Sequence, residues 1–219
     1  MKLSWKREMF AIAIVLTLVA ISIQYYPILP DRMPSHFDAA GRVNAWMGKN
    51  EFFVLWAIVI VSIYLLVTFL PFIDPLRRKF EPRYKVMLLV RDIMLVIFGA
   101  MFLLSINIGM GGSAYVNWVG VVVGVLLIVL GNYMPKFPQN WFVGIKTPWT
   151  ISSETVWKKT HIVGGWAFAA AGIVYIVASI MRLGGDVQLF VILLAAAIPI
   201  IYSFVLYKKL ESAPSAPKS

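Results

Sequence analysis

Residues 118–134 read Trp-Val-Gly-Val-Val-Val-Gly-Val-Leu-Leu-Ile-Val-Leu-Gly-Asn-Tyr-Met, and this stretch contains no charged side chain. A helix of about 17 to 25 mostly apolar residues is long enough to cross the roughly 30 Å of hydrocarbon in a bilayer. Stretches of similar length and composition occupy 9–26, 52–71, 93–110, 162–181 and 189–207. The sequence therefore predicts an all-α fold, a polytopic membrane protein with six transmembrane helices.

The composition of the whole chain agrees with a membrane protein. Of its 219 residues, 60% are hydrophobic and 14% are charged, whereas soluble domains average about 45–50% and about 25%. These proportions exclude an ordinary cytosolic enzyme, a disordered protein and a nucleic-acid-binding domain. The absence of cysteine excludes disulfides, thiol chemistry and cysteine-based metal sites.

The first apolar stretch has two interpretations. Basic residues precede it, as in a signal peptide, but its apolar run is longer than a usual signal sequence. The residues that follow it, Ile-Gln-Tyr-Tyr-Pro, also lack the small-residue pattern of a cleavage site. We therefore expect an uncleaved transmembrane helix.

The distribution of charge predicts the orientation of the chain. The net charge is +10, and with a cytoplasmic N-terminus sixteen of the 20 Lys and Arg residues fall on the cytoplasmic side. The acidic residues divide so that the outer face is neutral and the inner face carries the whole +10. We expect a multi-pass protein of the cell membrane with both termini in the cytoplasm. Its inner face would contact anionic lipid, with no direct nucleic-acid partner.

Arg91 and Asp92 precede the third apolar stretch. Residues 93–110 are long enough to span the membrane without them, so we expect an interfacial position with Arg91 extended toward the headgroups. Adjacent side chains point about 100° apart on a helix, so the two are not expected to pair with each other. A buried polar site is the alternative, because ionisable residues inside a span are often functional.

Small residues in three stretches indicate close helix contacts. They are Gly120-x-x-x-Gly124, Gly165-x-x-x-Ala169 and the alanines at 195–197. We interpret them as packing positions. The chain is expected to form one integral membrane domain, in which residues 1–71 hold two helices and the outer loop 27–50. Residues 72–219 hold four helices and the cytoplasmic loop 131–161.

The outer loop, 27–50, contains prolines that interrupt a continuous helix. Because Phe37 and Trp46 are apolar, we expect the loop to fold back as a compact cap at the outer interface. His36 has three interpretations: a metal site with Asp31 and Asp38, a hydrogen bond to a loop carbonyl, and an exposed side chain that titrates near neutrality. The hydrogen bond is favoured, and no metal site is expected.

The cytoplasmic loop, 131–161, is rich in tryptophan. Ser152 or Ser153 can cap a helix that has Glu154 in its first turn. We expect a short amphipathic helix over about 154–161 at the inner interface, with Trp157 facing lipid. This segment is either an interfacial anchor or a docking or ligand site. The residues of the second interpretation are Asn140, Lys146, Trp149 and His161.

Enzymatic motifs are missing from the sequence. It contains no zinc-protease, nucleophile-elbow, phosphate-loop or paired-carboxylate pattern. Its two histidines are expected on opposite sides of the membrane, which argues against a metal hydrolase. No cofactor, metal or catalytic residue is expected, and the chain is predicted not to be an enzyme.

Both loops resemble segments of the SdpI family, which is named for the immunity protein against the sporulation-delay toxin. The outer segment, from Leu29 to Trp46, resembles a domain of unknown function found in bacterial and archaeal membrane proteins. The inner segment resembles the hallmark of the family, although Lys146 stands where Arg is usual, and Asn44 replaces a common Asp in the outer loop. The outer-loop residues of this resemblance are Leu29, Pro30, Pro34, His36, Phe37, Gly41 and Trp46. The inner-loop residues are Gly131, Asn132, Pro135, Asn140, Gly144, Lys146, Thr147, Pro148, Trp149, Thr150, Trp157, Lys159, Thr160 and His161.

The resemblance implies a non-enzymatic membrane protein that gives immunity to a membrane-active peptide. It also implies signalling, in which a transcriptional repressor is held at the membrane. The expected partners are membrane lipids, an extracellular peptide toxin and a cytoplasmic repressor. The alternative function is a small transporter for a peptide or lipid-like solute. Its polar path would include Arg91, Asp92, Asn107, Asn132 and Tyr175.

Overall fold

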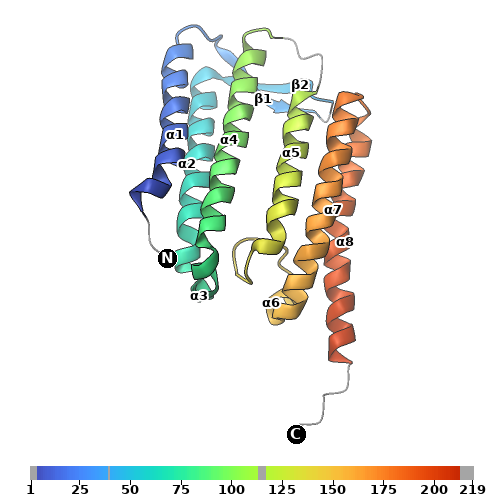
Figure 1. Ribbon diagram of the computed structural model, residues 1–219. Helices are drawn as coiled ribbons and strands as arrows, with labels where there is room; N and C mark the ends of the chain where they lie inside the picture. Colours follow the sequence, from blue (N-terminus) through green and yellow to red (C-terminus); the bar gives the residue numbers. More distant parts are fainter. Residues whose placement is uncertain (1–3, 39, 113–116, 213–219) are drawn as a thin grey trace.

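The computed structural model describes residues 4–38, 40–112 and 117–212. Within these residues, six helices are long and apolar enough to cross a membrane, which confirms the predicted membrane-helical fold. Figure 1 shows them packed side by side. They are α1 (Trp5–Tyr25), α2 (Lys49–Ile73), α4 (Tyr84–Gly109), α5 (Trp118–Tyr133), α7 (Glu154–Ile180) and α8 (Gly185–Glu211).

Two helices begin well before the apolar stretches that predicted them. α4 starts at Tyr84, and α7 starts at Glu154 with the hydroxyl of Ser153 accepting a hydrogen bond from the N–H of Val156. The predicted serine cap is therefore confirmed. The separate amphipathic helix over 154–161 is wrong, because these residues form the first two turns of α7. Helical hydrogen bonding continues through polar residues once a cap and an apolar face are in place.

Short elements connect the long helices at one end of the molecule. They are α3 (Arg77–Phe80), η1 (Glu81–Arg83), η2 (Met134–Lys136) and α6 (Pro148–Ser152). We call this end the loop end. In Figure 1 it also holds the first turn of α1 and the last turn of α8. The assignment of this end to the cytoplasm stays a prediction from the charges.

The opposite end, which we call the hairpin end, carries a β-hairpin that no sequence pattern predicts. Strands β1 (Arg32–Phe37) and β2 (Val43–Gly48) pair antiparallel, with Arg32 opposite Gly48 and Phe37 opposite Val43. The register is irregular between Pro34 and Phe37, where the proline N has no hydrogen to donate. The predicted compact outer cap therefore takes the form of a short, distorted hairpin.

The hairpin rests on the helices below it through apolar side chains. Met33 of β1 is fully buried and packs in one cluster with Phe52 of α2 and Phe102 of α4. Leu29, just before β1, is buried in the same cluster. Burial of side chains of this size contributes roughly 1.5–3 kcal/mol each, so the hairpin is fixed to the helices below it.

The six helices form two groups of three, visible in Figure 1 as α1, α2 and α4 beside α5, α7 and α8. α5 and α7 approach most closely, through glycines. A Cβ on Gly131 would lie 2.6 Å from the carbonyl oxygen of Gly165, and one on Gly172 would lie 2.5 Å from that of Gly124. Ala169 also lies against Gly131. Gly124, Gly165 and Ala169, which the sequence predicted as packing positions, lie at this close helix contact.

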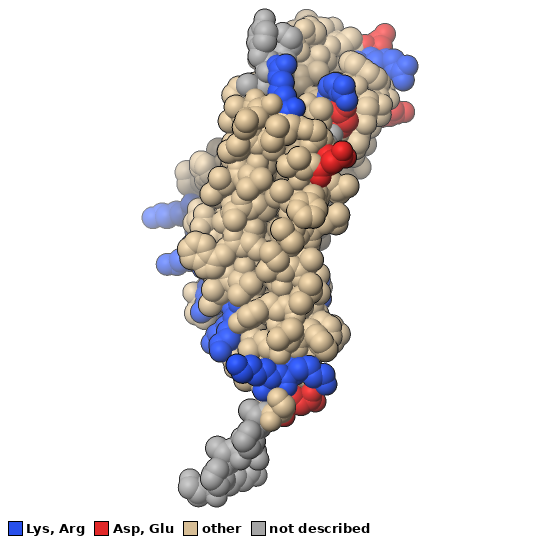
Figure 2. All heavy atoms as spheres, turned by 90° about the vertical axis from the view of Figure 1, so that its right-hand side faces the viewer, with Lys and Arg blue, Asp and Glu red and all other residues tan. Residues whose placement is uncertain are grey.

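The surface over α7 and α8 has the pattern of a lipid-facing wall. Figure 2 shows charged side chains at both ends of this face and none across the middle. Large apolar side chains are exposed there, including Trp166 at 77% and Phe190 at 65%. In water such a surface would be costly, whereas in a bilayer it contacts hydrocarbon. The protein is therefore a multi-pass membrane protein.

Candidate functional site

The segment between η2 and α7, residues 137–153, is a folded unit that we call the inner loop. Asn140 lies at its centre and is fully buried. Its Nδ2 donates to the carbonyls of Pro138 and Val143, both at 2.8 Å. Its Oδ1 accepts from the N–H groups of Phe142 and Val143 at 2.9 and 2.6 Å. One side chain therefore satisfies four backbone groups of a tight turn.

Two further polar side chains fix the inner loop to its neighbours. The Nε2 of Gln139 donates to the carbonyls of Thr150 and Ile151, and its Oε1 accepts from the Nζ of Lys79 at 2.8 Å. The buried Asp74, which ends α2, accepts from the N–H of Trp141 at 2.9 Å. The loop is thus attached to the α2–α3 connection, far away in sequence.

A capping box starts α6 in the middle of the inner loop. Thr147 and Thr150 exchange hydrogen bonds between their side chains and backbone N–H groups, at 2.9 and 3.1 Å. The Oγ1 of Thr150 also donates to the carbonyl of Ile145. Pro148 occupies the first helical position, where no backbone N–H is needed. The hydroxyl of Thr147 lies 3.1 Å from that of Ser203, which joins the loop to α8.

Trp157 is buried, and the expectation that it faces lipid is wrong. It is 1% exposed, and its Nε1 donates to the carbonyl of Phe137 at 3.1 Å. The Trp157 ring stacks on that of His161, with 4.0 Å between the ring centroids. The inner loop folds over this face of α7, so a tryptophan that could have been an interfacial anchor becomes part of the core.

His161 uses both ring nitrogens within the protein. Its Nε2 accepts from the N–H of Ile145 at 3.0 Å, so its Nδ1 carries the hydrogen and donates to the carbonyl of Trp157 at 2.8 Å. The imidazole is therefore neutral and has no free nitrogen for a metal or a substrate. Gly144 permits this contact: its φ is +117°, and a Cβ there would collide with the His161 Nε2.

The four residues of the predicted docking site lie in one folded unit but do not share one exposed surface. Asn140 and His161 are buried with their polar atoms occupied. The half-buried ring of Trp149 packs on Phe204 of α8, with 5.0 Å between centroids. Lys146 is the exposed member, and its Nζ donates to the carbonyls of Trp141 and Phe142.

The remaining inner-motif residues have separate positions. Gly131 belongs to the α5–α7 contact. Thr160 is fully buried, and its Oγ1 has no hydrogen-bond partner among the described residues. Asn132, Pro135 and Lys159 are exposed.

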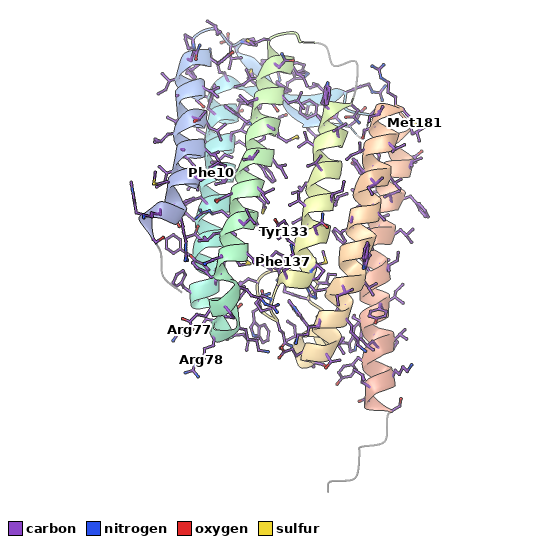
Figure 3. All side chains as sticks on the ribbon, viewed as in Figure 1. Phe10, Arg77, Arg78, Tyr133, Phe137 and Met181 are labelled. Atoms are coloured by element: carbon purple, nitrogen blue, oxygen red, sulfur yellow. The ribbon has the colours of Figure 1, made fainter. Side chains whose placement is uncertain are left out.

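Beside the inner loop, the structure forms a polar hollow that no sequence motif predicts. Its volume is about 230 Å³. An ion pair of 2.8 Å between Lys79 and Glu154 crosses this region, and Arg83 donates to the carbonyl of Lys136. Figure 3 shows Arg77 and Arg78 projecting away from the helices at the same end. The hollow is formed by segments that include residues more than 50 positions apart in the sequence, so no local sequence pattern predicts it. It is lined by Lys79, Pro82, Arg83, Phe137, Pro138, Gln139, Glu154, Trp157 and Lys158.

At the hairpin end, the polar residues pair with near neighbours. The Nδ1 of His36 lies 2.6 Å from the Oδ1 of Asn44, so the partner of His36 is a side-chain amide and not the expected backbone carbonyl. Asp38 accepts from the N–H and Nε of Arg42 at 2.9 and 2.8 Å, and the backbone N–H holds the pKa of its carboxyl below the usual value. The fully exposed carboxylate of Asp31 lies 3.9 Å from Lys49. No group of three metal-ligating side chains occurs among the described residues.

The other outer-motif residues separate into buried and exposed sets. Leu29 and Pro34 are buried, and Phe37 is half-buried. Trp46 is 47% exposed and Pro30 is exposed. Gly41 has a φ of +78° in the turn between the strands.

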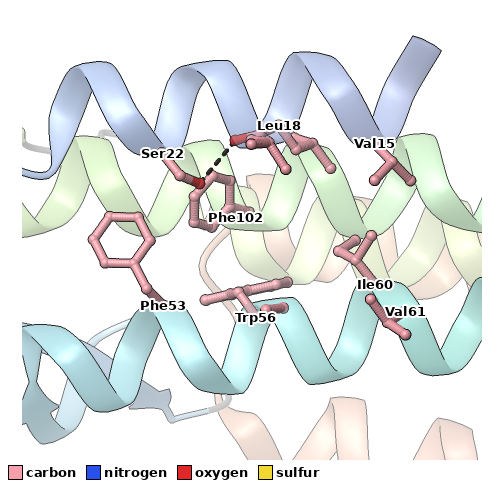
Figure 4. A pocket seen from close by; sticks show the side chains of 10 residues that line it. Val15, Leu18, Ser22, Phe53, Trp56, Ile60, Val61 and Phe102 are labelled. Atoms are coloured by element: carbon pink, nitrogen blue, oxygen red, sulfur yellow. Dashed lines mark hydrogen bonds between the residues drawn. The ribbon is translucent and has the colours of Figure 1, made fainter. Parts of the chain in front are cut away.

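Below the hairpin, an apolar groove of about 110 Å³ lies between α1 and α2. Figure 4 shows Phe53 and Trp56 of α2 facing Leu18 of α1, with Phe102 of α4 behind them. The hydroxyl of Ser22 donates to the carbonyl of Leu18, so this polar group is occupied within its own helix. The groove therefore offers aromatic and aliphatic contacts to an apolar ligand.

Arg91 lies inside the first helix group, which makes the interfacial expectation wrong. It is fully buried and pairs with Glu8 at 2.6 Å. It also contacts Asp92 at 2.8 Å, although the two were not expected to pair. The guanidinium bends back toward its neighbour because both side chains are flexible, so the 100° between adjacent residues does not keep the charged ends apart.

The structure does not join the five residues of the predicted transport path. Asn107 is exposed and lies sixteen residues beyond Arg91 on α4, roughly 24 Å at 1.5 Å per residue. Asn132 is exposed at the loop end of α5, and Tyr175 is buried on α7 in the other helix group. Only Arg91 and Asp92 are in contact.

Comparisons with known proteins agree with both motifs. Residues 136–203 match the family described as SdpI/YfhL protein family, and residues 12–63 match a domain of unknown function, DUF1648. The chain is 26% identical over 214 residues to the immunity protein SdpI of Bacillus subtilis (strain 168), an alignment that covers 94% of this chain and 98% of that protein. No solved structure matches. The resemblance that both loops predicted is confirmed.

Proposed function

We propose that this chain, a multi-pass membrane protein similar to immunity protein SdpI along 94% of its length, protects its own membrane from a membrane-active peptide. The similarity is to an immunity protein and not to an enzyme family, and it spans both the hairpin and the inner loop. The proposal places recognition of the peptide at the hairpin end and a response at the loop end.

The observation that carries the proposal is the pairing of an exposed aromatic hairpin with an apolar groove below it. Trp46 is 47% exposed on β2, and the groove beneath is lined by Phe53 and Trp56. A peptide that enters the outer leaflet would meet aromatic side chains at the depth where such rings are favoured. On the hairpin, His36 is already paired with Asn44, and Asp38 is paired with Arg42. An apolar peptide could therefore contact the aromatic side chains without breaking these interactions.

The loop end offers a different kind of surface. Lys79, Arg83 and Lys158 line the polar hollow beside the inner loop, and Arg77 and Arg78 extend from the same end. A cytoplasmic regulator with an acidic surface would be attracted to these side chains. We further propose that this regulator is a transcriptional repressor, and that it is held at the loop end when the peptide is bound.

Protection can be tested in a host strain that is sensitive to the sporulation-delay toxin and lacks its own immunity protein. Expression of the chain is expected to restore growth at toxin concentrations that kill the host. The double variant Trp46→Ala, Trp56→Ala should lose most of this protection. Trp166→Ala is the matched control, because Trp166 is 77% exposed on α7 and lies in the other helix group. Absence of protection by the unchanged chain, at verified membrane levels, would overturn the proposal.

Regulator binding needs a separate measurement. Charge reversal at the hollow, Arg83→Glu with Lys158→Glu, should release a bound repressor from the membrane fraction while survival in toxin is unchanged. If both properties fall together, the hollow supports the fold and not a partner. Lys209→Glu, on an exposed residue of α8, controls for a general change of surface charge.

A further inference from the structure

The polar hollow beside the inner loop carries more positive than negative charge. Three of its lining side chains are basic, Lys79, Arg83 and Lys158, and one is acidic, Glu154, which gives a net charge of +2. These side chains come from α3, η1 and α7, which are separate elements in the sequence. The volume of about 230 Å³ is large enough for a phosphate group and the atoms next to it.

The positive charge of the hollow is only partly neutralised within the protein. One carboxylate serves two ammonium groups, because Glu154 lies 2.8 Å from the Nζ of Lys79 and 3.5 Å from that of Lys158. Arg83 has no acidic partner among the described residues. Its Nη1 donates to the carbonyl of Lys136, and a guanidinium has five N–H groups. The hollow therefore keeps hydrogen-bond donors and positive charge for an added anion.

The hollow lies where the lipid-facing surface of α7 ends. Lys158, Ile162 and Trp166 are spaced four residues apart, so they share one face of this helix. Ile162 and Trp166 are exposed and apolar, as expected for side chains in contact with hydrocarbon. Lys158 is the next member of this row toward the loop end, and it lines the hollow. A lipid chain that lies along the row would therefore bring its headgroup to the hollow.

The buried part of the hollow is apolar. Phe137, at the loop end in Figure 3, and Trp157 are both buried there, and Pro82 and Pro138 complete the lining. The indole N–H of Trp157 is occupied by the carbonyl of Phe137, so this part of the hollow offers rings and no free donor. Exposed cations beside apolar rings fit an amphipathic ligand, in which a phosphate is joined to glycerol and acyl chains, better than a free phosphate ion.

We propose that this hollow binds the phosphate of an anionic phospholipid, with Arg83 and Lys158 as its direct partners. The acyl chains of the lipid lie along the exposed row of α7. Because the hollow has a net positive charge, it favours a headgroup with a net negative charge over a zwitterionic one. Glu154 neutralises part of the positive charge and so limits the affinity. The inference goes beyond the proposed function, in which an acidic regulator would compete with this lipid for the same side chains.

Native mass spectrometry of the full chain in detergent tests the proposal with two lipids of equal chain length, phosphatidylglycerol and phosphatidylcholine. Phosphatidylglycerol is expected to bind more tightly. The double variant Arg83→Gln, Lys158→Gln should weaken its binding at least about tenfold, because both basic side chains that face the phosphate are lost. Lys208→Gln with Lys209→Gln is the matched control. It removes the same charge from the last turn of α8, outside the hollow, and should keep the binding.

Glu154→Gln gives a result that a folding defect cannot imitate. The change removes the acidic group of the hollow and releases Lys79 and Lys158 from their ion pairs. The affinity for phosphatidylglycerol should therefore rise about threefold. The matched control is Glu211→Gln, which removes an exposed carboxylate that pairs with Lys208 on α8. This control should leave the affinity unchanged.

The proposal is overturned if the two lipids bind equally, or if the α8 double variant loses as much affinity as the hollow variant. It is also overturned if Glu154→Gln weakens binding. Inorganic phosphate that binds as tightly without lipid would make a soluble anion the ligand, and hexaglutamate that binds more tightly than the lipid would assign the hollow to an acidic protein. No toxin or regulator is present in these measurements, so their failure would leave the proposed protection standing.

Discussion

The inner loop and the hairpin are both recognisable in the sequence, but they use their polar residues differently. Asn140 and Thr150 of the inner loop and His161 of α7, which contacts the loop, are buried, and their side chains bond to the loop or to α7. In the hairpin, His36 and Asp38 are paired with near neighbours at an exposed turn. The difference teaches that the inner motif determines the fold of a buried loop, whereas the polar side chains of the outer motif stay near the surface and are paired with close neighbours.

The largest effect is expected at Gly144. Gly144→Ala forces a side chain into a φ of +117° and against the His161 Nε2, so we expect a loss of about 3 kcal/mol of stability. The measurement is the free energy of unfolding in detergent, followed by the fluorescence of Trp157. Gly111→Ala is the control for backbone strain, because Gly111 has a φ of +86° and no atom of a described residue lies within 4 Å of the new Cβ. Equal losses in the two variants would contradict a role for the His161 contact.

Two asparagines, one in each region, give a smaller and directly matched comparison. Asn140→Ala leaves buried N–H and C=O groups without partners, and we expect it to cost about 2 kcal/mol. Asn44→Ala removes the exposed bond to His36, and its cost should stay below about 0.5 kcal/mol. Both values come from denaturant unfolding of the purified chain. A cost at Asn44 that matches the cost at Asn140 would remove the distinction between the regions.

The smallest effect is expected from the carboxyl group of Asp38. The backbone N–H of Arg42 lowers the pKa of this group in the folded chain, so its stabilising contribution is present above the pKa of the unfolded chain. That contribution is lost as the pH falls through the lowered folded value. Acid titration of the hairpin, followed by the fluorescence of Trp46, should therefore show a shallow transition that Asp38→Asn abolishes. The fluorescence of the inner-loop tryptophans should not follow it.

The membrane helices could be predicted from the sequence because hydrocarbon thickness determines the length of an apolar run. All six predicted stretches lie within or overlap the long helices of the structure. The ends were less predictable, because α4 and α7 extend into polar residues. Ser153 caps α7, and side chains near the start of α4 bond to partners in other segments. The hairpin was missed because Pro34 interrupts β1 and its apolar residues do not alternate cleanly.

For the candidate site, the sequence predicted which residues take part but not which of them are buried or in contact. The motifs located the inner loop, and the serine cap of α7 follows from local chemistry. The burial of Trp157 depends on Phe137, twenty residues earlier, and that of Arg91 depends on Glu8, 83 residues earlier. Contacts between distant segments have no local signature, so both side chains were expected at the lipid interface.

The separation of Glu8 and Arg91 along the chain also determines the order in which the protein can assemble. At about 5–20 residues per second, the ribosome makes Arg91 roughly 4–17 s after Glu8. During that interval α1 must reside in or near the membrane with a carboxyl group whose guanidinium partner does not yet exist. Insertion of α4 supplies the partner and joins α1 to the growing bundle. The ion pair between α1 and α4 can therefore form only after all of the first three long helices have been synthesised.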